Sequence, residues 1–134
     1  MNRLYTSLAC LSLFIATPVG AEDLAGELRD LSTLGFQQFQ DASRVFVKTT
    51  EPANYQIDDS KPGVVVLLLE NTQVSKRINT LPLDTRYFRS PVRLVTVEII
   101  EGASPTTKIV ISLREDAAFQ EVRKDTMLAL DFSR

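Results

Sequence analysis

The side chains best suited to binding lie in one twenty-residue stretch, residues 71–90, with the sequence NTQVSKRINTLPLDTRYFRS. It carries four basic residues against one acidic residue, a net charge of +3, whereas the rest of the chain after residue 21 carries −6. Arg77, Arg86 and Arg89 can pair with anionic groups, and Tyr87 can stack on a sugar ring. This stretch therefore predicts a contact surface for an anionic polymer with sugar faces, while the acidic balance of the chain argues against nucleic acid.

The same stretch also allows a purely structural interpretation. Leu81, Leu83, Tyr87 and Phe88 could pin it to a folded domain, with its charges keeping it solvated. A connection of this length without strand periodicity is long for a compact domain, and such loops often have a function. Both interpretations remain open at the level of sequence.

The chain is poorly provided with catalytic groups. It has no histidine, and its one cysteine, Cys10, lies in a predicted leader. The rest of the chain therefore excludes a structural zinc site, a Cys or His nucleophile and a histidine general base. The acidic pairs Asp58-Asp59 and Glu115-Asp116 lie in turn-like stretches, where such residues need no further role. We expect no enzyme activity, no metal and no cofactor.

Residues 1–21 have the pattern of a cleaved signal peptide. Arg3 supplies positive charge, residues 8–16 form an apolar run too short to span a bilayer, and a small-residue cleavage pattern ends at Ala21. Cleavage there would release 113 residues, enough for one domain, into the periplasm or outside the cell, with no membrane span. The alternatives are a lipoprotein cysteine at Cys10, which shortens the apolar run, and an uncleaved anchor.

Two later stretches of the chain are similar to each other. Residues 44–56 read RVFVKTTEPANYQ and residues 108–120 read KIVISLREDAAFQ, sixty-four positions apart without a gap. Both pass from alternating β-branched residues through a turn to an aromatic residue. A duplicated β-unit that packs against its copy needs no active site, so the repeat favours a binding module over an enzyme.

The remaining pattern predicts an all-β domain. Residues 22–30 are expected to form a short helix or a linker, followed by a domain over residues 31–134. Six consecutive apolar residues, 64–69, follow a turn at residues 60–63 and are typical of a strand buried on both faces. About eight short strands at this spacing predict a β-sandwich built from two similar halves. Each half has an apolar face that only the other half can cover.

In their order along the chain, these segments resemble an AMIN domain, a periplasmic module found at the front of cell-wall amidases and type IV pilus secretins. The resemblance covers residues 31–132 and rests on SRVFVKTTEPANYQI, KPG before VVVLLLENTQV, LPLDTRYFRSPV and KIVISLREDAAFQEVRKDTMLALDF. It implies a symmetric β-sandwich of two similar halves and non-catalytic binding of peptidoglycan in the periplasm. The candidate peptidoglycan contacts are then Arg77, Arg86, Tyr87 and Arg89.

The sequence departs from the AMIN pattern in two places. The family commonly has an arginine entering the strand after the proline turn and an aspartate within it, whereas here Gly63 follows Pro62 and residues 67–69 are leucines. No amidase or secretin domain follows Arg134, so we expect a stand-alone adaptor or a truncated product. The alternatives to peptidoglycan binding are a protein adaptor that docks an envelope machine, such as a pilus or secretion channel, through a strand edge, and an enzyme or ligand carrier with a pocket between the sheets.

Overall fold

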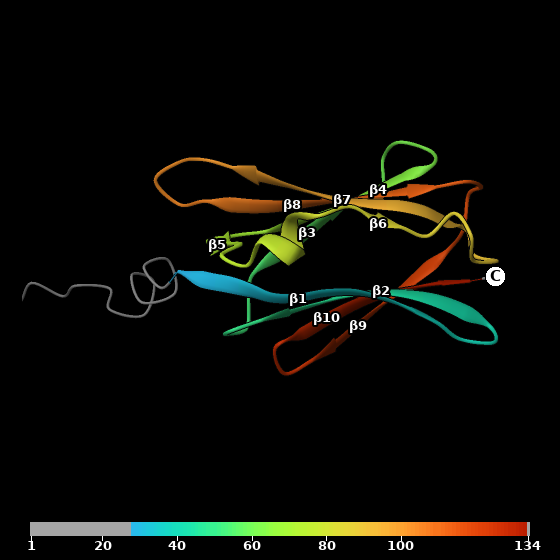
Figure 1. Ribbon diagram of the computed structural model, residues 1–134, viewed down its shortest axis with the longest axis horizontal. Helices are drawn as coiled ribbons and strands as arrows, with labels where there is room; N and C mark the ends of the chain where they lie inside the picture. The colour runs from blue at the N-terminus through green and yellow to red at the C-terminus, as the bar shows by residue number, and fades with distance from the viewer. Residues whose placement is uncertain (1–27, 134) are drawn as a thin grey trace, which may run out of the picture.

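The computed structural model describes residues 28–133 as two stacked β-sheets (Figure 1). The signal peptide predicted for residues 1–21, with Cys10, lies outside the described residues, as do residues 22–27 of the predicted helix or linker. Within the described part of the chain, no helix is long and apolar enough to cross a membrane. The predicted all-β fold with two sheets is confirmed.

The first sheet has the strand order β5-β1-β2-β10-β9, and the second has the order β3-β4-β8-β7-β6. The strands of the first sheet are β1 (Arg29–Gln38), β2 (Ala42–Thr49), β5 (Thr72–Gln73), β9 (Phe119–Lys124) and β10 (Met127–Ser133). The strands of the second sheet are β3 (Tyr55–Asp58), β4 (Val64–Leu69), β6 (Leu83–Asp84), β7 (Val92–Ile100) and β8 (Thr106–Leu113). A 3-10 helix, η1 (Arg77–Thr80), follows β5. Eight of these strands are longer than two residues, which agrees with the number predicted.

The strand pairing repeats between the two halves of the chain. Val47 of β2 pairs with Leu34 of β1 and Leu128 of β10, and Ile111 of β8, sixty-four residues after Val47, pairs with Val95 of β7 and Val65 of β4. The strand order of the two sheets repeats as well. The first sheet contains β1-β2-β10-β9, and replacing each strand by its counterpart in the other half gives β7-β8-β4-β3. This is the order in the second sheet, read in the opposite direction.

A β-bulge is repeated as well. The register shifts between Leu31 and Thr33 in β1 and between Val92 and Leu94 in β7. Leu31 and Val92, which stand beside the two shifts, are both fully buried. Each bulge therefore lets an inward-facing residue on one side of the shift reach the core without changing the inward-facing positions on the other side.

Each half of the chain contributes one hairpin to each sheet. The hairpin β1–β2 belongs to the first sheet and β3–β4 to the second, whereas β7–β8 belongs to the second and β9–β10 to the first. The contact of β2 with β10 and that of β4 with β8 therefore join the two halves at the centre of both sheets. Because the halves are interleaved, neither half can form a complete sheet without the other.

One apolar core lies between the sheets, because alternate residues of each long strand point inward. Val45 and Val47 of β2 and Ile109 and Ile111 of β8, the matching residues of the repeat, all belong to it. The other buried apolar residues of the core are Leu31, Ala53, Val65, Leu67, Leu69, Val92, Val95, Leu128, Leu130 and Phe132. The sequence prediction of a shared core is confirmed for the four matching residues of the repeat.

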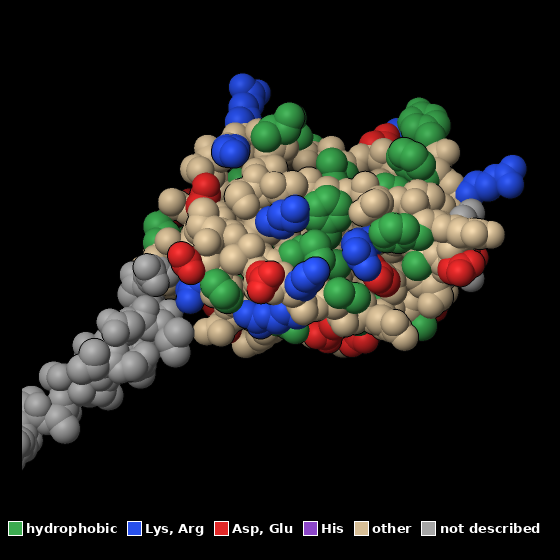
Figure 2. Space-filling view, turned by 90° about the horizontal axis from the view of Figure 1, so that it is seen from below, with side chains coloured by type: hydrophobic (Ala, Val, Ile, Leu, Met, Phe, Trp, Pro, Cys, Tyr) green, Lys and Arg blue, Asp and Glu red, His purple; other side chains and the backbone are tan. Residues whose placement is uncertain are grey.

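Two local predictions were wrong. Strand β1 begins at Arg29, so the last two residues of the segment predicted as a helix or linker belong to the sandwich. The strand at residues 64–69 is buried on one face only, because Val64, Val66 and Leu68 point away from the core and stay half-exposed. The other sheet has an outer face of different composition, on which basic side chains stand among hydrophobic ones (Figure 2).

Candidate functional site

The connector, residues 71–90, closes one side of the sandwich. Its strand β5 pairs with β1 at the edge of the first sheet, and β6 pairs with β7 at the edge of the second (Figure 1). Between them, Asn79 of η1 is buried and its amide donates hydrogen bonds to the carbonyls of Leu31 and Ser32, at 3.1 and 3.0 Å. The connector is thus a built part of the fold rather than a loose tether.

The side chains that pin the connector are only partly those predicted. Leu83 packs against the core, and the hydroxyl of the buried Thr85 donates to the carbonyl of Val92 at 2.7 Å. The ring of Phe88 lies 5.3 Å from that of Phe36, although Phe88 remains half-exposed. Tyr87 is 87 % exposed, so it pins nothing and its ring is available to a ligand.

Backbone acceptors hold the end of the connector in place. The guanidinium of Arg114, just after β8, donates to the carbonyl of Arg86 at 2.8 Å, and the amide of Arg114 donates to the carbonyl of Pro91 at 2.8 Å. The side-chain amide of Gln38 donates to the carbonyl of Arg89 at 2.7 Å. These contacts come from both sheets, so the loop that carries Tyr87 is held in place by hydrogen bonds on both sides.

Arg86 and Asp84 form a bidentate ion pair. The Nε of Arg86 lies 2.9 Å from Oδ1 of Asp84, and Nη2 lies 2.7 Å from Oδ2. Side-chain hydrogen bonding with Arg86, and then the backbone amide of Arg86, lower the pKa of Asp84, and the pKa of Arg86 is raised by the same pair. The guanidinium also lies 5.9 Å from the ring centre of Tyr87. Asp84 therefore orients Arg86 and balances its charge.

A hollow of about 270 Å³ adjoins this loop, lined by Arg89, Ser90, Pro91, Arg114 and Glu115. Arg93, at the bulge of β7, accepts a hydrogen bond at its carbonyl from the amide of Thr85, which brings its backbone to the same end of the connector. We call Arg86, Arg89, Arg93 and Arg114, together with Tyr87, the arginine end. Two guanidinium groups beside a shallow hollow and an exposed ring can pair with carboxylates and stack on a sugar.

Only part of the predicted site comes together. Arg86, Tyr87 and Arg89 lie at the arginine end, whereas Arg77 lies in η1, which contacts β1 near Leu31. Phe88 contacts β1 at Phe36, five residues further on. At a rise of about 3.3 Å per residue, the two regions are roughly 16 Å apart along β1.

Sequence reasoning missed Arg93 and Arg114. Arg93 follows the connector by three residues, and Arg114 lies inside the second copy of the repeat. The backbone amide of Arg114 donates to the carbonyl of Pro91, and Arg114 and Arg89 line the same hollow, so charge counted along the chain could not have found Arg114. The excess of arginine within residues 86–93 was the one available signal.

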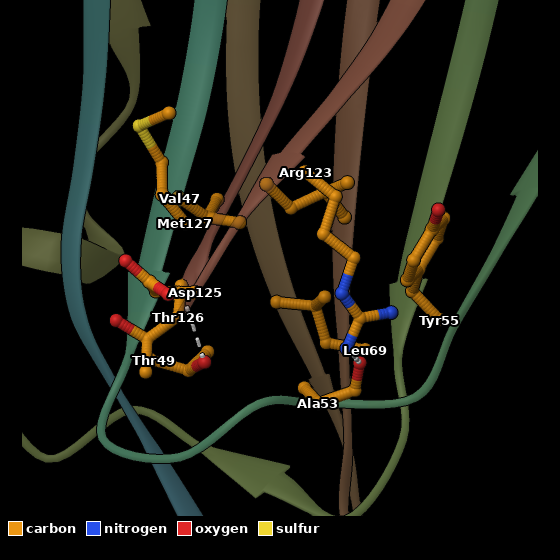
Figure 3. A pocket seen from close by; sticks show the side chains of 10 residues that line it. Val47, Thr49, Ala53, Tyr55, Leu69, Arg123, Asp125, Thr126 and Met127 are labelled. Carbon is orange, nitrogen blue, oxygen red and sulfur yellow. Dashed lines mark hydrogen bonds between the residues drawn. The ribbon is translucent and has the colours of Figure 1, made fainter.

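The opposite side of the sandwich is closed by polar contacts (Figure 3). The guanidinium of Arg123 donates to the carbonyl of Ala53 at 3.1 Å and lies 5.3 Å from the ring centre of Tyr55, whose hydroxyl donates to Glu121 at 2.9 Å. The hydrogen bond to Glu121 is the main cause that raises the pKa of Tyr55. The gap enclosed here measures about 10 Å³, room for about one water molecule and not for a ligand.

No protein-family model matches the chain, and neither does any curated protein. The resemblance to AMIN domains therefore stays a prediction from sequence. Among the described residues, no group of three or more Asp, Glu, Cys or His side chains is placed to hold a metal ion.

Proposed function

We propose that this protein is a non-catalytic binding module of the cell envelope that holds peptidoglycan at its arginine end. The observation that supports this proposal best is the hollow lined by Arg89 and Arg114, next to the loop that carries the exposed ring of Tyr87. Peptidoglycan offers both kinds of group that such a surface can bind, sugar rings and the carboxylates of its peptides. Arg89 and Arg114 would pair with carboxylates, and Tyr87 would stack on a sugar.

Binding is expected to be stronger when the ligand is a polymer with many copies of the same chemical groups. Exposed ion pairs are individually worth about 0–1 kcal/mol and weaken as salt screens them. A polymer that presents the same carboxylates and sugars many times raises the effective concentration at each site. Affinity for an intact cell-wall polymer should therefore exceed affinity for its soluble fragments.

The same proposal includes export to the periplasm, with cleavage after Ala21. It is motivated by the apolar run and the small-residue pattern of the leader. Mass spectrometry of protein from the periplasmic fraction should find an N-terminus at Glu22. A chain that begins with lipid-modified Cys10, or a full-length chain retained in the membrane, would contradict this part.

A second candidate function, a protein adaptor for an envelope machine, is favoured by a different feature. Strands β9 and β3 are the outermost strands on the side opposite the connector, and each has one hydrogen-bonded neighbour. An extended peptide of a pilus or secretion channel could add to β9, the longer of the two edges. Such an adaptor would co-purify with one envelope protein and would not sediment with the cell wall.

Co-sedimentation with purified sacculi separates the two functions. The expected result is that the protein pellets with sacculi at low salt and is released as the salt concentration rises. Digestion of the sacculi to soluble fragments should leave it in the supernatant. Protein that stays in solution with intact sacculi at low salt would overturn the proposal and favour the adaptor.

A further inference from the structure

The outer face of the second sheet has an aliphatic patch around β4. Val64, Val66 and Leu68 of β4 alternate with core residues and point away from the core, and Val66 pairs directly with Val110 of β8. Ile100, at the end of β7, is 46 % exposed. These five side chains line a hollow of about 460 Å³ on this face. The solvated face of an antiparallel sheet is normally polar, so this composition needs an explanation.

The fold itself does not require an aliphatic face. By the repeated register, the positions of Val66 and Leu68 correspond to Ala129 and Asp131 on the first sheet. There, Asp131 forms an ion pair with Arg44 across the strands. Of these two positions, that of Leu68 is thus aliphatic on the second sheet alone, whereas Val66 and Ala129 are both apolar. The sequence pattern of β4 is that of a strand covered on both faces, and residues 28–133 cover only one.

We propose that a second copy of this chain covers this face, sheet against sheet, in a two-fold symmetric dimer. In such an interface the same patch meets itself, so the patch must complement its own charges. Asp58 and Lys61 border the hollow on one side, and Lys108 lies across it, 3.8 Å from Glu98. These two acids and two bases sum to zero, with Glu70 further along the same face held by the side-chain amide of Gln56 at 3.1 Å, so the hollow itself brings no net charge against a second copy.

The outer face of the first sheet is unsuited to the same contact. Arg44, Lys48 and Lys124 stand on it against Asp131, which leaves an excess of positive charge. Two such faces would repel each other. The charge balance and the aliphatic residues therefore select the second sheet as the face that pairs with itself, and this inference does not depend on the peptidoglycan site.

Sedimentation velocity of the purified protein over a range of concentrations tests the dimer. A species of twice the mass of one chain should appear by about 100 µM, a range that detects even weak association. Leu68→Asp and Ile100→Asp should each raise the dissociation constant by roughly tenfold or more. Thr33→Asp is the matched control, because Thr33 lies on the outer face of the first sheet, and it should change nothing.

The outcomes are distinct. Wild-type protein that remains a monomer at about 100 µM would overturn the proposal and leave the face to a different protein. A dimer that both sheet-two variants leave intact would overturn the assigned interface. Circular dichroism confirms that each variant folds, and an aspartate is compatible with this register because Asp131 occupies the position that corresponds to Leu68. Should Leu68→Asp fail to fold, Ile100→Asp at the exposed end of β7 decides the question.

Discussion

The two sheets are alike inside and different outside. At matching inner positions, Val47 and Ile111 are both buried and apolar. At matching outer positions, Lys48 and Asp131 of the first sheet correspond to Ser112 and Leu68 of the second. Phe46 and Val110, which also match, are both apolar. The outer face of the first sheet has basic side chains among hydrophobic ones (Figure 2), whereas the outer face of the second has an aliphatic patch around β4 that is bordered by charged residues.

The comparison indicates which positions can differ between the two halves of the chain. Inner residues of both halves fill one shared core, so a change in one half is felt by the other. Outer residues have fewer partners in the other half, among them the ion pair of Arg44 with Asp131. The arginine end has no counterpart in the other half of the repeat. Most of it belongs to the connector, which occurs once, and Arg114 corresponds to Thr50. The proposed binding site therefore occurs once in a molecule whose core is built twice.

The largest effect is expected from removing a shared core side chain. Ile111→Ala should lower the free energy of unfolding by about 2–5 kcal/mol, since Ile111 is fully buried between the sheets. Val47→Ala, at the matching position, should also be costly, whereas Val110→Ala on the outer face should cost less than half as much as Ile111→Ala. Urea unfolding measures all three. Equal losses for Ile111→Ala and Val110→Ala would show that inner and outer faces are not distinguished as described.

A smaller effect is expected at Gly35, whose counterpart on the second sheet is Thr96. A Cβ added at Gly35 would clash with Cζ of Phe46, so the ring must move. Gly35→Ala should cost about 1–3 kcal/mol through overpacking. In a Phe46→Ala background the same change should be close to neutral, because the ring is gone. An undiminished cost in that background would locate the strain elsewhere.

Much of this fold could be predicted from the sequence, because alternation reports which side chains face the core. Prediction from alternation failed where polar residues are buried. Arg29 is buried in β1, and its Nε donates to the carbonyl of Pro52 at 2.6 Å, a long-range contact that periodicity cannot show. It also failed at Val64–Leu69, since an apolar run cannot tell a face covered by its own chain from one left open.

The site was less predictable than the fold. Arg86, Tyr87 and Arg89 were found because they are neighbours in sequence, and they remain neighbours in the structure. Arg114 joins them only through the place where β8 ends, and Arg77 is removed from them by the position of η1. Charge counted along the connector treats all of its arginines alike, although Arg86 is balanced by Asp84.

The smallest effect concerns that ion pair. Hydrogen bonding with Arg86 lowers the pKa of Asp84, so the pair is present at neutral pH and is lost as the pH falls through this lowered pKa. In Arg86→Ser the pKa of Asp84 should rise toward its ordinary value, with little change in stability because both groups are exposed. Carboxyl NMR titration measures it, with Asp58 as the control, since Ser60 lowers its pKa independently. An unchanged pKa of Asp84 would contradict the pairing.

Sedimentation of two charge-matched variants with sacculi tests whether the arginine end binds peptidoglycan. One variant combines Arg89→Ser with Arg114→Ser at the arginine end, and the other combines Lys48→Ser with Lys124→Ser on the outer face of the first sheet. Each removes two positive charges. With both variants folded by circular dichroism, the arginine variant should bind sacculi about five- to thirtyfold more weakly at low salt, and the lysine variant should bind like wild type. Equal binding by the two variants would contradict the account.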